Sequence, residues 1–95
     1  MANPVTVNCP KKEWTKVASS KTLGTIWLNG NFFNKGKAYF VFQDAGGSTP
    51  TLYPSESGST AIAIKDEILP FESTVAIDIF LWPPSADIVA VVGAE

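Results

Sequence analysis

The sequence predicts an all-β domain, and three observations lead to that prediction. Alternating or β-branched segments recur about every ten residues, a spacing typical of sandwiches and barrels. The seven prolines lie where such segments would end. No window shows the 3.6-residue apolar periodicity of an amphipathic helix. We therefore expect residues 1–95 to form a single antiparallel β-sandwich of six to eight strands, with a jelly roll as one arrangement.

The first half of the chain alternates strand signals with short turn signals. Asn29-Gly30 is a strong turn signal, because both residues accept positive φ. Ser19-Ser20-Lys21 is interpreted as another turn, and Gly24 as a bulge or a point of close backbone approach. The expected strands are residues 4–8, 14–18, 22–28 and 37–43, with a short fragment at 32–33.

The second half opens with residues 44–60, which are mostly Gly, Ser, Thr and Pro. Such a composition cannot bury a core, so we expect a long exposed loop in which only Leu52 and Tyr53 can turn inward. Long loops in compact domains often carry function. The expected strands that follow are residues 60–65, 74–82 and 87–92, with one helical turn or a bend at 66–70 and a short strand at 71–72.

The last two strands and the Pro83-Pro84-Ser85 turn between them predict a β-hairpin that is apolar on both faces. Because side chains alternate along a strand, one face carries Val75, Ile77, Ile79 and Leu81, and the other carries Ala76, Asp78, Phe80 and Trp82. A sheet over a single core needs only one apolar face. We therefore expect another copy of the chain, or a larger assembly, to cover the second face.

Asp78 interrupts this apolar strand, and two interpretations of it remain open. It is either an ordinary solvent-facing residue, or a charge that opposes edge-to-edge aggregation or pairs across an oligomer contact.

Composition and charge restrict the partners. Only 17% of residues are charged, against about 25% in ordinary soluble domains, which suits a protein with covered surfaces. The net charge is −2, yet residues 1–40 carry +5 and residues 41–95 carry −7. Either the two halves mix in space, or a dipolar surface steers assembly. Nucleic-acid binding is disfavoured, because all the cations are lysine and the acidic half would repel phosphate.

The residue types that carry most enzyme chemistry are missing. With no histidine and one cysteine, the chain cannot build a Ser–His or Cys–His nucleophile, a zinc site or an internal disulfide. Cys9 is either a small buried hydrophobe or a reactive thiol. Asp44, Asp66 and Glu67 lack calcium-loop spacing, and no phosphate-binding motif occurs. We expect no enzyme activity, no cofactor and no metal.

Neither a secretory signal nor an apolar run long enough to span a bilayer is evident. We therefore expect synthesis in the cytoplasm and no membrane partner.

Exposed aromatic residues are the candidates for a binding surface. The Trp82-Pro83-Pro84 segment is rigid and apolar, as an interface anchor should be. Aromatic side chains such as Tyr53 and Trp27 would alternatively form a platform for sugars. The candidate protein-interface residues are Trp14, Tyr39, Phe80, Trp82, Pro83, Ile88, Ala90 and Val92, or the opposite register of the last strand.

Residues 5–10, 14–18 and 22–26 resemble the start of small virion proteins of tailed bacteriophages, and residues 73–80 are similar to late strands of the same proteins. These are capsid decoration (cement) proteins and head-fibre proteins. The resemblance implies a β-sandwich, often a homotrimer, made in the host cytoplasm and bound to the major capsid protein on the virion surface. The alternatives are a carbohydrate- or receptor-binding module of a phage tail or spike, and a head–tail connector.

Overall fold

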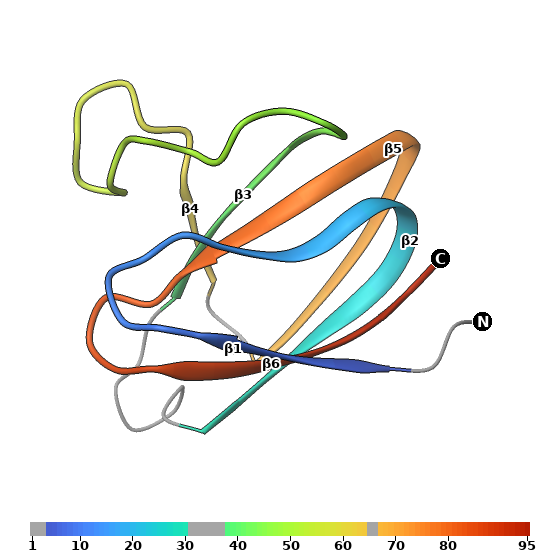
Figure 1. Ribbon diagram of the computed structural model, residues 1–95, viewed down its shortest axis with the longest axis horizontal. Coiled ribbons are helices and arrows are strands. Elements are labelled where there is room, and N and C mark those ends of the chain that lie inside the picture. The colour runs from blue at the N-terminus through green and yellow to red at the C-terminus, as the bar shows by residue number, and fades with distance from the viewer. Residues whose placement is uncertain (1–3, 31–37, 65–66) are drawn as a thin grey trace.

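The computed structural model describes residues 4–30, 38–64 and 67–95, and these residues form six antiparallel strands without a helix (Figure 1). None of the described segments is a helix of the length and apolarity that crossing a membrane requires. The all-β prediction is confirmed. The strands are β1 (Val5–Cys9), β2 (Thr15–Gly30), β3 (Ala38–Asp44), β4 (Ile62–Ile64), β5 (Ile68–Trp82) and β6 (Ile88–Ala94).

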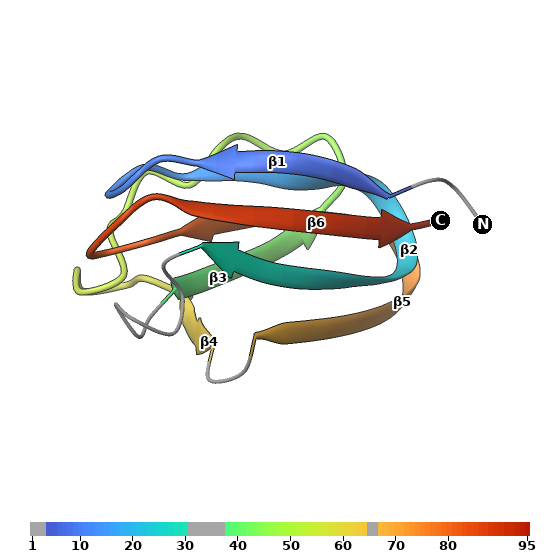
Figure 2. The ribbon, with the colours of Figure 1, turned by 90° about the horizontal axis from the view of Figure 1, so that it is seen from below.

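All six strands belong to one continuous curled sheet in the order β1-β6-β2-β5-β3-β4. The curl arises because β2 and β5 are long and bend together (Figure 2). Residues 15–21 of β2 pair with residues 77–81 of β5, and residues 23–27 pair with residues 68–72. The antiparallel pairing is confirmed, while the two separate sheets of a sandwich stay a prediction, because the hydrogen-bonded ladder is continuous.

The predicted terminal hairpin is wrong. β6 does not pair with β5 but lies between β1 and β2, with Val92 opposite both Val5 and Ile26. Residues 83–87 therefore carry the chain from one half of the curled sheet to the other. The β6 position is favourable because both of its edges are hydrogen-bonded, while Ile88 and Ala90 reach the core.

Two predicted strands, 14–18 and 22–28, are one strand, and the expected turn at 19–21 is a bulged bend. The register of β2 against β5 shifts between Lys16 and Leu23, and Ser20 has φ 55°. A bulge bends a strand without reversing it. The bend at 68–70 and the short strand at 71–72 are likewise parts of β5. The 32–33 fragment and residues 65–66 lie outside the described residues.

The core consists of side chains from both halves of the sheet that meet inside the curl. Ile26 of β2, Ile79 and Leu81 of β5 and Ala90 of β6 are all buried in one cluster. Gly24 is the point of close backbone approach that the sequence predicted. A Cβ on Gly24 would lie 2.5 Å from the carbonyl oxygen of Gly93, so any other residue there must push β2 and β6 apart.

The second face of β5 is covered by the chain itself. Phe80 and Asp78 point away from the core residues Ile79 and Leu81, yet each is only 1% exposed. The segment between β3 and β4 packs over this face, so the expectation that a partner covers it is wrong. This segment reaches the face at Leu52, which lies beside Val41, the β3 partner of Phe80, and at Gly46, whose N–H bonds to Asp78.

Substituting Gly24 tests the close contact between β2 and β6. We expect Gly24→Ala to lower the free energy of unfolding by about 1–3 kcal/mol, because the added methyl group has backbone as its nearest neighbour. Gly47→Ala is the matched control, since its nearest atoms belong to the flexible Gln43 side chain, and it should cost less than about 0.5 kcal/mol. Urea unfolding measures both. Equal costs would contradict the close contact.

Candidate functional site

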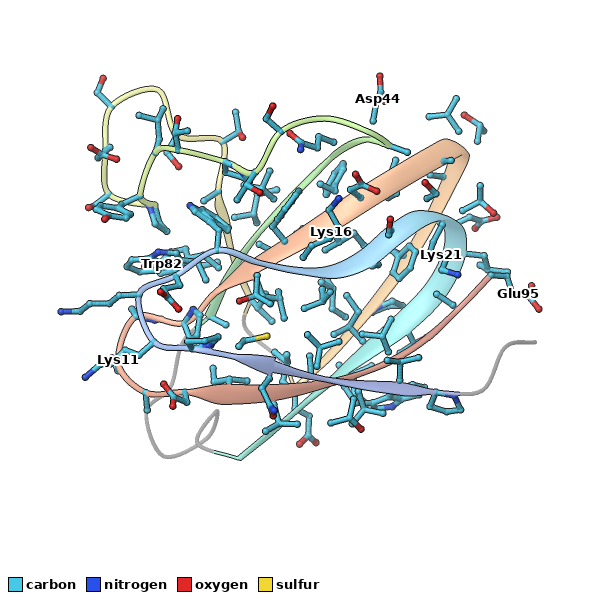
Figure 3. All side chains as sticks on the ribbon, viewed as in Figure 1. Lys11, Lys16, Lys21, Asp44, Trp82 and Glu95 are labelled. Atoms are coloured by element: carbon cyan, nitrogen blue, oxygen red, sulfur yellow. The ribbon has the colours of Figure 1, made fainter. Side chains whose placement is uncertain are left out.

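An aromatic cluster lies at the end of the molecule opposite Glu95 (Figure 3). Trp82 is its centre, with ring centroids 6.4 Å from Trp14, 6.2 Å from Tyr39 and 5.8 Å from Tyr53. The Trp14 indole N–H donates a hydrogen bond to the carbonyl oxygen of Leu52 at 3.0 Å. The cluster therefore fastens the 45–61 segment over the second face of β5.

The structure divides the predicted interface residues into two groups. Trp14, Tyr39 and Trp82 come together in the aromatic cluster and are partly exposed. The others are buried by the chain's own residues, those of β6 in the core and Phe80 on the second face of β5. This second group comprises Phe80, Pro83, Ile88, Ala90 and Val92.

Asp78 is a buried structural carboxylate, so both interpretations of it were wrong. Its two oxygens accept hydrogen bonds from the backbone N–H of Ser20 at 2.9 Å and of Gly46 at 3.1 Å. The Lys16 ammonium lies 3.5 Å away and also sits over the Phe80 ring. Asp78 thus joins the β2 bulge, the start of the 45–61 segment and β5 at one point.

These contacts stabilise the ionised form of Asp78. The hydrogen bond from Ser20 is the largest influence and lowers the pKa of the carboxyl below its ordinary value of 3.8. Burial opposes this, and the Gly46 N–H and Lys16 add to the lowering. The sequence signal was a carboxylate inside an apolar strand, which usually means a specific internal partner.

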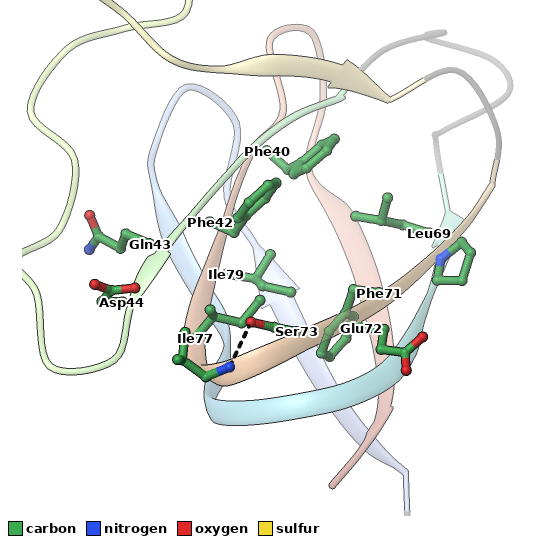
Figure 4. A pocket seen from close by; sticks show the side chains of 12 residues that line it. Phe40, Phe42, Gln43, Asp44, Leu69, Phe71, Glu72, Ser73, Ile77 and Ile79 are labelled. Atoms are coloured by element: carbon green, nitrogen blue, oxygen red, sulfur yellow. Dashed lines mark hydrogen bonds between the residues drawn. The ribbon is translucent and has the colours of Figure 1, made fainter.

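An open groove lies between β3 and the first half of β5, and we call it the β3–β5 groove (Figure 4). The groove exists because only part of β5 pairs with β3. Residues 77–82 of β5 pair with β3, while residues 68–72 of β5 bend away and pair with β2. Its volume is about 510 Å³. Its apolar lining includes Phe40 and Phe42, whose rings stack with centroids 5.9 Å apart.

Sequence reasoning missed this groove. Phe42 and Val75, on its two walls, are each 55% exposed. The pattern did place Phe40 and Phe42 on one face of a strand, but it gave no sign that the opposite strand would bend away. Exposed apolar side chains that face one another across a groove are a common mark of an interaction site.

The described residues offer little for metal or covalent chemistry. No group of three or more Cys, Asp or Glu side chains is placed to hold a metal ion within residues 4–30, 38–64 and 67–95. Cys9 is buried, and burial raises the pKa of its thiol to about 11. A thiol with so high a pKa is protonated at neutral pH and packs as a small hydrophobe.

Comparisons of this chain with protein-family models, with curated proteins and with solved structures each found no match. The class of the protein is described by its fold and site alone: it is an all-β domain with a curled antiparallel sheet and an open apolar groove.

Acidification tests the role of Asp78. Because its pKa is lower in the folded than in the unfolded chain, its stabilising contribution is complete above about pH 4 and is lost as the pH falls through the folded pKa. We expect Asp78→Asn to have a lower urea midpoint than wild type at neutral pH, with a gap that narrows towards about pH 2. The exposed control Glu13→Gln should follow wild type throughout. A pH-independent gap would contradict this role.

Replacing Trp14 tests how the 45–61 segment is held. Trp14→Phe keeps an aromatic ring but loses the N–H donor to Leu52. We expect the free energy of unfolding to fall by about 0.5–1.5 kcal/mol and subtilisin to cleave within residues 45–61 faster. Trp27→Phe, at an exposed position, is the control and should leave the cleavage rate unchanged. Equal cleavage of both variants would contradict the proposed anchoring.

Proposed function

We propose that the chain is a non-enzymatic structural protein that self-associates and decorates or cements a phage capsid. The observation that carries this proposal is that the folded chain leaves two apolar surfaces open on different faces of its sheet. One is the β3–β5 groove. The virion setting rests on the sequence resemblance, and the proposed partners are further copies of the chain, as a homotrimer, and the major capsid protein at the virion surface.

The second apolar surface is a stripe across the outer side of β6, β2 and β5. Trp27 is paired with Val91 on one side and Ile68 on the other, so these three side chains share one face of the sheet. Trp27 is 39% exposed, and Ile68 and Leu23 are each 46% exposed. We call Leu23, Trp27, Ile68 and Val91 the outer stripe.

Two separate apolar surfaces suit a decoration role because one can join copies while the other binds the shell. A contact of about 800 Å² per partner, at about 25 cal/mol per Å² of apolar area, gives a large gross driving force, from which the costs of association are subtracted. The outer stripe is the surface that we assign to self-association. Its members on β2 and β6 lie on strands that are paired along both edges, so contact there would use side chains rather than strand addition.

The second candidate function is a carbohydrate- or receptor-binding module of a phage tail or spike. The observation that favours it is Tyr53, which is 54% exposed on the 45–61 segment beside Trp82. Sugar platforms use aromatic faces open to solvent. Here the ring planes are tilted by 40° between Tyr53 and Trp82 and by 46° between Trp14 and Trp82, which suits packing of the cluster better than a flat platform.

Sedimentation of purified protein tests self-association through the outer stripe. We expect wild type to form a trimer that dissociates on dilution, and Trp27→Lys to stay monomeric, because a charge replaces the central apolar side chain. Phe42→Lys, on the groove, is the matched control and should leave the trimer intact. A wild-type monomer at high concentration, or a trimer unaffected by Trp27→Lys, would contradict this assignment.

The virion setting has its own test. Mass spectrometry of purified phage particles that encode the chain should detect it, and immunogold labelling should place it on the head surface. Retention of the chain on polysaccharide that is lost in Tyr53→Ala, with none on particles, would favour the second candidate instead.

A further inference from the structure

The β3–β5 groove has the form of a site for apolar side chains. Ile77 and Ile79 are buried and lie at its floor side, while Phe42 and Val75 are half-exposed on its walls. Its volume of about 510 Å³ falls within the range of about 300–1,000 Å³ that is usual for ligand pockets. The folded chain leaves this apolar surface without a cover from any described residue.

Among the described residues, the charged side chains that line the groove are acidic. Asp44, at the end of β3, and Glu72, on β5, both line it (Figure 4). No lysine is among the described residues that line it. Both carboxylates are exposed to solvent. A ligand that carries positive charge next to apolar groups would therefore complement this site.

The backbone at the groove opposes strand addition. The Leu28 N–H bonds to the Glu67 carbonyl oxygen, and bonded and non-bonded pairs alternate along an antiparallel ladder. Pro70, opposite Thr25, therefore falls at a non-bonded position, where its backbone faces the open edge. Proline has no N–H to donate there, and such a position is a common protection of edge strands. Binding must come mainly from side chains that enter the groove.

A second copy of the chain fits the groove poorly. A two-fold contact through the groove would place the same two acidic side chains of both copies against each other. The described lysine pair Lys11-Lys12 lies in an exposed turn, and its neighbour Trp14 is already packed in the aromatic cluster. That turn therefore offers charge without an exposed apolar side chain.

We propose that the β3–β5 groove binds an extended segment of a different protein, one in which apolar side chains alternate with lysine or arginine. The apolar side chains fill the space between Phe42 and Val75, and the basic ones pair with Asp44 and Glu72. This inference rests on the proposed structural function, whose shell-binding surface it specifies. The outer stripe is then the surface for copies of the chain, and the groove is the surface for the protein that the chain decorates.

Nuclear magnetic resonance with short synthetic peptides tests the proposal. The probe is a capped peptide of alternating lysine and leucine, added to the ¹⁵N-labelled full chain at low salt. We expect saturable changes in the chemical shifts of the backbone amides of residues 40–44 and 71–75. Added salt should weaken the binding that causes them. Two matched peptides, with glutamate in place of lysine or serine in place of leucine, should cause no saturable shift.

Variants of the chain locate the binding. Phe42→Ser should abolish the shifts, and Asp44→Asn and Glu72→Gln should each weaken binding by about threefold, the usual effect of an exposed ion pair. Val5→Ser removes an equally exposed apolar side chain from β1 and should bind as wild type does. A wild-type-like amide spectrum of each variant shows that the fold is intact.

Several outcomes would overturn the proposal. These are equal binding of the glutamate peptide, shifts confined to another face, no binding of the lysine–leucine peptide, or occupation of the groove by a second copy, seen as self-association that Phe42→Lys abolishes. The proposed function fails separately, through absence of the chain from virions or of a trimer in solution. A chain found on virions whose groove ignores the peptide would refute only the groove assignment.

Discussion

The buried carboxylate of Asp78 is the interaction on which the rest of the structure depends. It binds the backbone at Ser20, where β2 bulges, and at Gly46, where the chain leaves β3. A bulge leaves backbone groups unpaired, and Asp78 accepts a hydrogen bond from one of them, the N–H of Ser20. β2 and β5 bend at the same place, and their shared bend produces the curled sheet. The core, the aromatic cluster and the β3–β5 groove all follow from that curl.

The chain has more apolar strand surface than one small interior can hide, and it deals with the excess in two ways. It folds the 45–61 segment over Phe80 and anchors it through Trp14. A segment poor in apolar residues can serve as this cover, because only Leu52 and Tyr53 need to touch the sheet. The remaining excess stays in the groove and in the outer stripe, and these are the surfaces through which the molecule can recognise others.

Local patterns predicted the strands well and their arrangement poorly. Alternation located β1, β3 and β6 to within about two residues, and Gly24 was identified as a point of close approach. The hairpin of β5 with β6 was wrong because sequential strands usually pair, and no local signal shows that β6 fits between β1 and β2. The site was predicted in part. Trp14, Tyr39 and Trp82 do meet, but the groove depends on a bend at 72–76 that the sequence pattern does not reveal.

The pairing of β1 with β6 has a consequence for how the polypeptide matures. β1 precedes every other described strand along the chain, yet among the described residues its ladder partner is β6, which follows them all. Until synthesis reaches β6, the apolar side chains of β1 and the second half of β2 have no neighbour on that side. Sheets built from such distant segments close slowly. Pro4 and Pro10 flank β1 and have no N–H to donate, which makes its ends less able to pair with another chain during that interval.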